Sequence, residues 1–148
     1  MTVQTAAPSA PAGLDADPAW IAAHPRVQRV PSKDLTLFIR RDFLSAEECV
    51  ELIDRIDAKR RPSTIADDNG DGYFRTSETC DLDHADPFVA AINARLDAFA
   101  GIATAHGEPI QGQRYSVGQE FKAHTDYFDP KGADFARYCA VAGNRTWT

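Results

Sequence analysis

A strand-like run that leads into a turn and a His-x-Asp pair constrains the fold of this chain more than any other feature. Residues 110–117 have the β-branched and aromatic content of a strand, and the residues that follow can turn the chain back. His124 and Asp126 then lie two positions apart. Because residues i and i+2 of an extended strand point the same way, this spacing lets an imidazole and a carboxylate converge on one ion.

The expected hairpin has a two-residue loop at Gly118 and Gln119. This loop places Tyr115 opposite Lys122 and leaves Phe121 on the other face. The polar face of the hairpin then carries Gln113, Tyr115, Lys122, His124 and Asp126. A loop of odd length would reverse Tyr115, so this register is one of two alternatives.

Several short motifs together make the sequence similar to a known family. Two His residues and one carboxylate on one face hold iron in non-haem Fe(II) oxygenases. The motifs are Gln113-Arg114-Tyr115, Gly118-Gln119, Phe121, His124, Asp126 and Phe128, with residues 43–49, 75–79 and 143–148 outside this core. Over about residues 35–148 the chain resembles the prolyl 4-hydroxylase type of 2-oxoglutarate- and Fe(II)-dependent dioxygenase.

The resemblance implies a role for four residues. His124 and Asp126 correspond to the first two iron ligands. Tyr115 is similar to the strand tyrosine that helps to hold 2-oxoglutarate, and Thr148 falls where the family often has a threonine near that cosubstrate. The distal His ligand and the Lys or Arg that pairs with the far carboxylate lie on later strands of the family. We therefore expect the chain to be a fragment that is inactive by itself.

The implied fold is α+β: a double-stranded β-helix, or jelly roll, with supporting helices, present as its N-terminal portion. The implied reaction couples oxidative decarboxylation of 2-oxoglutarate to hydroxylation of a C–H bond, with Fe(II), O2 and L-ascorbate as the usual requirements. The substrate is a peptide or a small molecule that the sequence does not identify. The alternative is a non-catalytic jelly-roll module that binds a ligand or partner.

Other candidate metal sites are weaker. His24, His84 and His106 all precede the motif, and we expect them to be surface residues. Residues 67–78 fit the calcium-loop pattern D-x-[DN]-x-[DN]-G-x5-E. Flanking helices are missing, so we expect no calcium site to form from Asp67, Asn69, Asp71 and Glu78.

Composition excludes several functional classes. A net charge of -6 and a pI near 5.1 argue against nucleic-acid binding, and no apolar run is long enough for a membrane span. Residues 1–17 are expected to form a disordered Ala/Pro-rich tail, and residues 18–148 the dioxygenase domain. Three cysteines without framework spacing predict a reducing cytoplasm, and the abundance of Ala and Arg suggests a bacterial source.

Two helices are predicted from local signals. A capping box of Ser45 and Glu48 precedes an apolar stripe over residues 46–59, of which Cys49 is expected to be part of the core. Asp86 is the expected N-cap of a second helix that Gly101 closes. Strands are expected at residues 35–40, 74–79, 110–116 and 145–148.

Overall fold

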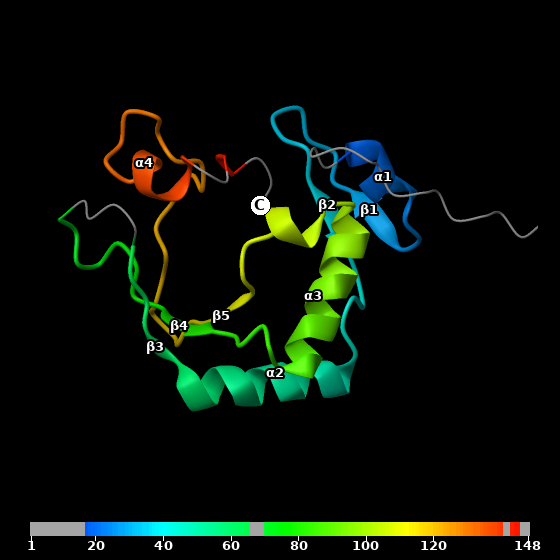
Figure 1. Ribbon diagram of the computed structural model, residues 1–148, viewed down its shortest axis with the longest axis horizontal. Coiled ribbons are helices and arrows are strands. Elements are labelled where there is room, and N and C mark those ends of the chain that lie inside the picture. The colour runs from blue at the N-terminus through cyan, green and yellow to red at the C-terminus, as the bar shows by residue number, and fades with distance from the viewer. Residues whose placement is uncertain (1–16, 66–69, 141–142, 146–148) are drawn as a thin grey trace, which may run out of the picture. The chain divides into compact units, whose positions relative to one another are not determined.

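The computed structural model describes residues 17–65, 70–140 and 143–145. It combines helices with small antiparallel sheets, so the expected α+β class is confirmed (Figure 1). Its elements are α1 (Pro18–Ala23), β1 (Val27–Arg29), β2 (Phe38–Arg40), α2 (Ala46–Lys59), β3 (Arg61–Pro62), β4 (Glu78–Asp81), α3 (Pro87–Ala100), η1 (Thr104–His106), β5 (Gln111–Arg114) and α4 (Phe135–Tyr138). The expected tail lies outside the described residues, apart from Asp17.

The chain divides into two compact units. The first unit comprises Met1–Ala46 and His84–Glu108, and the second comprises Glu47–Asp83 and Pro109–Thr148. Each unit has its own sheet: β1 pairs with β2 in the first, and β3, β4 and β5 pair in that order in the second. The candidate ligands His124 and Asp126 both belong to the second unit.

In the first unit, aromatic side chains join α1 to α3. The indole Nε1 of Trp20 donates to the carbonyl oxygen of Phe99 at 3.0 Å. The ring of His24 contacts both of these residues, with centroids 4.9 Å from Trp20 and 5.0 Å from Phe99. His24 is therefore half-buried, with its Nε2 atom inaccessible. The expectation of a surface residue is wrong for His24, because aromatic packing covers it, and correct for the exposed His84 and His106.

Helix α3 has the ends that its sequence predicts. The Asp86 side chain accepts hydrogen bonds from the backbone N–H groups of the first turn, and Gly101 closes the helix with a φ of 70°. A φ in this range is easily adopted by glycine, which has no Cβ. Val89 and Ile92 are buried, whereas Leu96 is exposed, so the expected apolar face is only partly buried.

In the second unit, α2 lies along the three-stranded sheet (Figure 1). Its Ile56 approaches Gly112 of β5 so closely that a Cβ on that glycine would collide with the Ile56 side chain. Gly112 pairs with Cys80 of β4, which is 1% exposed. The core of this unit therefore lies where the C-terminal half of α2 covers β4 and β5.

The N-terminal half of α2 is less covered than the sequence predicts. Cys49 is exposed and Ile53 is 55% exposed. A helix of 14 residues is about 21 Å long. The sheet has three strands of at most four residues each, so it is roughly 13 Å long and 15 Å wide. Because the sheet is shorter than the helix, it leaves part of the apolar stripe uncovered, and Cys49 is not a core residue.

The expected hairpin around Gly118 does not form. Instead, β5 pairs with β4, with Arg114 opposite Glu78. Further along the chain, Phe121 pairs with Arg75, which lies just before β4. Six residues separate Arg114 from Phe121, but only two separate Arg75 from Glu78, so four residues are looped out. They form a turn in which the amide N of Gln119 donates to the carbonyl oxygen of Ser116 at 2.9 Å. Tyr115 and Lys122 are consequently not cross-strand partners.

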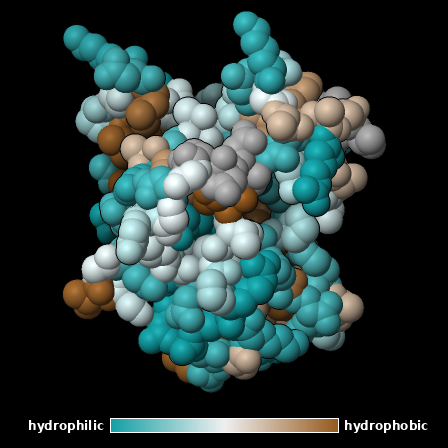
Figure 2. Space-filling model, turned by 90° about the vertical axis from the view of Figure 1, so that its left-hand side faces the viewer, coloured by the Kyte–Doolittle hydropathy of each residue, from teal (hydrophilic) through white to brown (hydrophobic). Residues whose placement is uncertain are grey.

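No helix in the described part of the chain is long and apolar enough to cross a membrane. On the face in Figure 2, hydrophobic residues form small separate patches among hydrophilic ones. Cys49, Cys80 and Cys139 are free thiols.

Candidate metal-binding site

The structure brings the side chains of His124 and Asp126 together. Nε2 of His124 lies 3.3 Å from Oδ1 of Asp126, and the two side chains are 31% and 33% exposed. Both residues lie in irregular backbone after Phe121, the residue that pairs with Arg75, so the expected strand is absent there. The predicted juxtaposition is confirmed, although a bent segment produces it instead of a strand.

The backbone of Lys122 fixes the orientation of the His124 ring. Nδ1 of His124 lies 2.6 Å from the carbonyl oxygen of Lys122. A carbonyl oxygen can only accept, so Nδ1 carries the proton in this hydrogen bond. In neutral His124 the lone pair is therefore on Nε2, the atom that faces the Asp126 carboxylate. Metal-binding histidines usually donate their other ring N–H in this way.

Phe121 supports the same ring from one side. The Phe121 and His124 rings are stacked, with centroids 3.6 Å apart and an interplanar angle of 23°. The guanidinium of Arg75 lies 4.5 Å from the Phe121 centroid. The sequence predicted Phe121 on the face opposite His124. That prediction is wrong, because the bend after Phe121 ends the strand alternation on which it rested.

Arg75 is held by a buried cluster of hydroxyl groups. Its Nε donates to Ser77 at 3.2 Å and its Nη2 to Thr79 at 3.2 Å. Ser77 and Thr79 are 2% and 4% exposed. The Ser63 hydroxyl lies 2.9 Å from Ser77 Oγ and 2.6 Å from Thr79 Oγ1, and Nη1 of Arg75 donates to the carbonyl of Thr64. Fixing the guanidinium in this way fixes the group against which Phe121 packs.

Sequence reasoning did not identify Arg75, nor Asn144, which contacts the chain just after Asp126. Both lie in segments that carry the family resemblance, residues 75–79 and 143–148. That resemblance was the available signal, but it gave no role to these two positions.

Tyr115 follows directly after β5. Its hydroxyl donates to Oε1 of Gln113 at 3.1 Å, and the residue is 45% exposed. Within the described residues it makes no hydrogen bond or ring contact with His124 or Asp126. Its role in binding 2-oxoglutarate stays a prediction. Thr148, the other residue predicted near the cosubstrate, lies outside the described residues.

The two described carboxylates of the calcium-loop pattern, Asp71 and Glu78, are each paired with a basic side chain. Oδ2 of Asp71 lies 2.6 Å from Nζ of Lys122, and Oε2 of Glu78 lies 3.1 Å from Nε of Arg60. The hydrogen bond from Lys122 holds the pKa of Asp71 below its usual value, and the same bond raises the pKa of Lys122. Glu78 begins β4, where the calcium-binding motif requires a helix. Asp67 and Asn69 lie outside the described residues.

His124 and Asp126 fit two positions of a metal site. Two ligand atoms about 2.1 Å from a shared ion and at right angles to each other are roughly 3 Å apart. The observed separation of 3.3 Å is close to that value. In the described residues no group of three His, Cys, Asp or Glu side chains could hold a metal ion. His124 is also the only histidine in the second unit.

Comparison with known proteins finds relatives among the plant prolyl 4-hydroxylases. The chain is 33% identical over 123 residues to prolyl 4-hydroxylase 2 of Arabidopsis thaliana, covering 80% of this chain and 41% of the relative. It is 33% identical over 111 residues to the probable prolyl 4-hydroxylase 4 of the same plant, covering 72% and 37%. It therefore spans about two-fifths of the length of these relatives. No family model and no solved structure matches.

These similarities confirm the resemblance: the chain contains sequence of the prolyl 4-hydroxylase type. The expectation of a bacterial, cytoplasmic protein is contradicted. The relatives come from Arabidopsis thaliana and point to a eukaryotic origin. Abundant Ala and Arg reflect only the base composition of a gene, and this made them a poor guide to its source.

Proposed function

We propose that this chain contributes two iron ligands, His124 and Asp126, to a 2-oxoglutarate- and Fe(II)-dependent dioxygenase of the prolyl 4-hydroxylase type. The observation that carries the proposal is the orientation of His124. Its Nδ1 donates to the Lys122 carbonyl, and its Nε2 faces the Asp126 carboxylate at 3.3 Å. A jelly roll with supporting helices is the fold that we propose around this pair.

The residues of the chain would prepare the site before any ion binds. Lys122 keeps the proton on Nδ1 of His124, so that Nε2 is available as a donor atom. The Phe121 ring limits rotation of the imidazole by stacking on it. With both groups about one-third exposed, an ion can reach them from solvent. The third ligand would come from outside the described residues.

The bound iron would supply the redox chemistry that couples decarboxylation of 2-oxoglutarate to C–H hydroxylation, with ascorbate keeping it reduced. Tyr115 is the proposed contact for 2-oxoglutarate, because its half-exposed hydroxyl can donate to a carboxylate instead of to Gln113. Thr148 is the second proposed contact. The substrate is proposed to be a peptide or a small molecule with an unactivated C–H bond.

The proposal is tested by measuring Mn(II) binding, with Mn(II) as a stand-in for Fe(II) that resists oxidation. We expect weak binding by the wild-type chain, because two protein ligands leave most coordination positions to water. His124→Ala and Asp126→Ala should each abolish it. His106→Ala is the matched control, since His106 is exposed and belongs to the first unit.

Equal Mn(II) binding by the wild type and His124→Ala would refute the proposal. Succinate release from 2-oxoglutarate, dependent on added Fe(II) and lost in His124→Ala, would demonstrate turnover. Metal binding without succinate release by the longest available form of the protein is the result expected of the non-catalytic alternative.

A further inference from the structure

The chain segment that carries both candidate ligands has few attachments of its own. Residues 123–128 form no backbone–backbone hydrogen bond in the part of the chain that the structure describes. The last such bond before them joins the amide N of Lys122 to the carbonyl of Phe74, and the next one after them joins Gly132 to Asp129. Side-chain contacts must therefore fix the position of Asp126.

The Asn144 side chain makes the main attachment. Its Oδ1 accepts from the amide N of Phe128 at 3.0 Å, and its Nδ2 donates to the carbonyl oxygen of the same residue at 2.8 Å. The side-chain amide of Asn144 thus makes two hydrogen bonds with the backbone of one residue, in the way that two opposite residues of an antiparallel pair do. Oδ1 also accepts from the amide N of Arg145 at 2.9 Å. Asn144 therefore ties Phe128 to a part of the chain 16 residues away.

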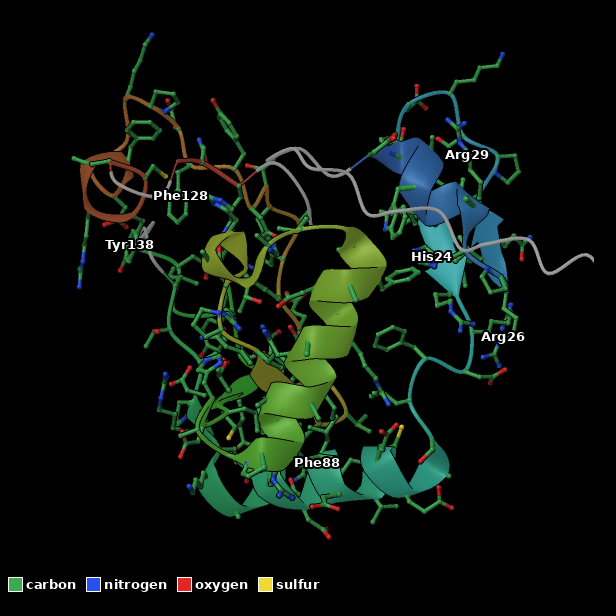
Figure 3. All side chains as sticks on the ribbon, turned by 45° about the vertical axis from the view of Figure 1, so that its right-hand side comes forward. His24, Arg26, Arg29, Phe88, Phe128 and Tyr138 are labelled. Atoms are coloured by element: carbon green, nitrogen blue, oxygen red, sulfur yellow. The ribbon has the colours of Figure 1, made fainter. Side chains whose placement is uncertain are left out.

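Arg145 continues this attachment toward the candidate site. Its Nη1 lies 3.4 Å from the carbonyl oxygen of Asp126, and its guanidinium lies 5.0 Å from the centroid of the Phe128 ring. The same ring also stacks on Tyr138 of α4, with centroids 5.4 Å apart and an interplanar angle of 24° (Figure 3). Phe128 is thus fixed through both its backbone and its ring.

We propose that Asn144 is a positioning residue for Asp126. It fixes the backbone of Phe128, two residues beyond the carboxylate, and it places Arg145 against the Asp126 carbonyl. The proposal rests on the proposed metal-binding role of His124 and Asp126. Asn144 does not contact the ion itself; it holds the carboxylate at the observed 3.3 Å from His124 Nε2.

An asparagine is required because the Phe128 peptide offers one donor and one acceptor. An aspartate has nearly the same shape but carries no donor. In Asn144→Asp, one carboxylate oxygen can still accept from Phe128 and Arg145, while the other faces the Phe128 carbonyl oxygen without a hydrogen. That repulsion should push the segment away and separate the two candidate ligands.

The test is a Mn(II) titration of the whole chain, comparing wild type, Asn144→Asp, His124→Ala and Asn93→Asp. We expect Asn144→Asp to weaken binding about tenfold, as is common when a group that orients a metal ligand is lost. Asn93→Asp is the matched control: Asn93 donates to Asp97 within α3, in the first unit, so the same chemical change should leave Mn(II) affinity unaltered.

The outcomes separate the two proposals. Equal affinity in the wild type and His124→Ala would remove the proposed metal site itself. Loss of binding in His124→Ala, with Asn144→Asp equal to the wild type within twofold, would overturn only the positioning role. A loss in Asn93→Asp as large as in Asn144→Asp would also overturn that role, because the effect would then not be specific to the site.

A measurement on the wild type covers the case in which Asn144→Asp fails to fold. The Phe128 amide should exchange with solvent deuterium more slowly than the amides of residues 123–127, for which the described part of the chain provides no comparable partner. Exchange of Phe128 as fast as that of these neighbours would overturn the attachment, and with it the positioning role.

Discussion

The backbone carbonyl of Lys122 accepts a hydrogen bond from Nδ1 of His124, two residues further along the chain, at 2.6 Å. The ammonium group of the same lysine lies 2.6 Å from Asp71. Lys122 therefore joins the loop before β4 to the candidate ligand His124. Its backbone does the orienting, and its side chain anchors that backbone.

The first prediction concerns the tautomer of His124. In its neutral form His124 should carry its proton on Nδ1, because the Lys122 carbonyl cannot donate to a bare Nδ1. Nitrogen-15 chemical shifts of the two ring atoms distinguish the tautomers, and the exposed His84 provides an internal comparison. A neutral His124 protonated on Nε2 would contradict the structure at this hydrogen bond.

The second prediction is a pH dependence of stability. The pKa of Asp71 is lowered from 3.8, chiefly by the hydrogen bond from Lys122. Its contribution to the free energy of unfolding is therefore complete above pH 3.8 and is lost as the pH falls through the lower folded-state value. The pKa of Lys122 is raised from 10.5, so its contribution is complete below that pH and is lost at higher pH.

Urea unfolding of the wild type and Asp71→Asn checks this prediction. The variant should be slightly less stable at pH 7, where the half-exposed pair is partly screened by solvent, and the difference should vanish in strong acid. Asp54→Asn is the control, because Asp54 is exposed on α2. A difference between wild type and Asp71→Asn that does not change with pH would show that the ion pair is not its cause.

Local signals in the sequence were sufficient to predict both long helices. The capping box and apolar period gave the bounds of α2, and Asp86 and Gly101 gave those of α3. Such signals depend on residues within one or two turns of each other. Burial of α2 was predicted less well, because the size of the sheet that covers it depends on distant residues.

The site was predicted only in part, because some of its contacts also depend on residues that are distant in the sequence. The proximity of His124 and Asp126 follows from their spacing, since a bend and a strand both allow residues i and i+2 to approach. The predicted strand pairing was wrong because β4 and Arg75, which lie 30 or more residues earlier in the chain, compete with the local hairpin. The contacts of Asn144 with Phe128 are equally non-local, and no spacing rule predicts them.

A third prediction concerns the packing of α2 on β5. In Gly112→Ala, the new methyl group would collide with the side chain of Ile56 and force the helix and strand apart. Overpacking of this kind costs about 1–3 kcal/mol in the free energy of unfolding. Gly72→Ala is the matched control, since a Cβ there meets nothing within 4 Å. Equal stability of the two variants in urea would contradict the close approach of Ile56.

The last prediction concerns Arg75, whose guanidinium donates to Ser77, Thr79 and the carbonyl of Thr64. In Arg75→Lys the charge is retained, but a single ammonium cannot reproduce the planar fork, so hydrogen bonds within a buried cluster are lost. We expect the free energy of unfolding to fall by about 1–3 kcal/mol.

Arg29→Lys is the control, because it makes the same change at an exposed residue of β1. The Arg75 variant should also shift the ring protons of His124, since the Phe121 ring that stacks on this imidazole loses its contact with the guanidinium. Equal stability of the two variants, together with an unchanged His124 spectrum, would mean that Arg75 does not support the candidate site through Phe121.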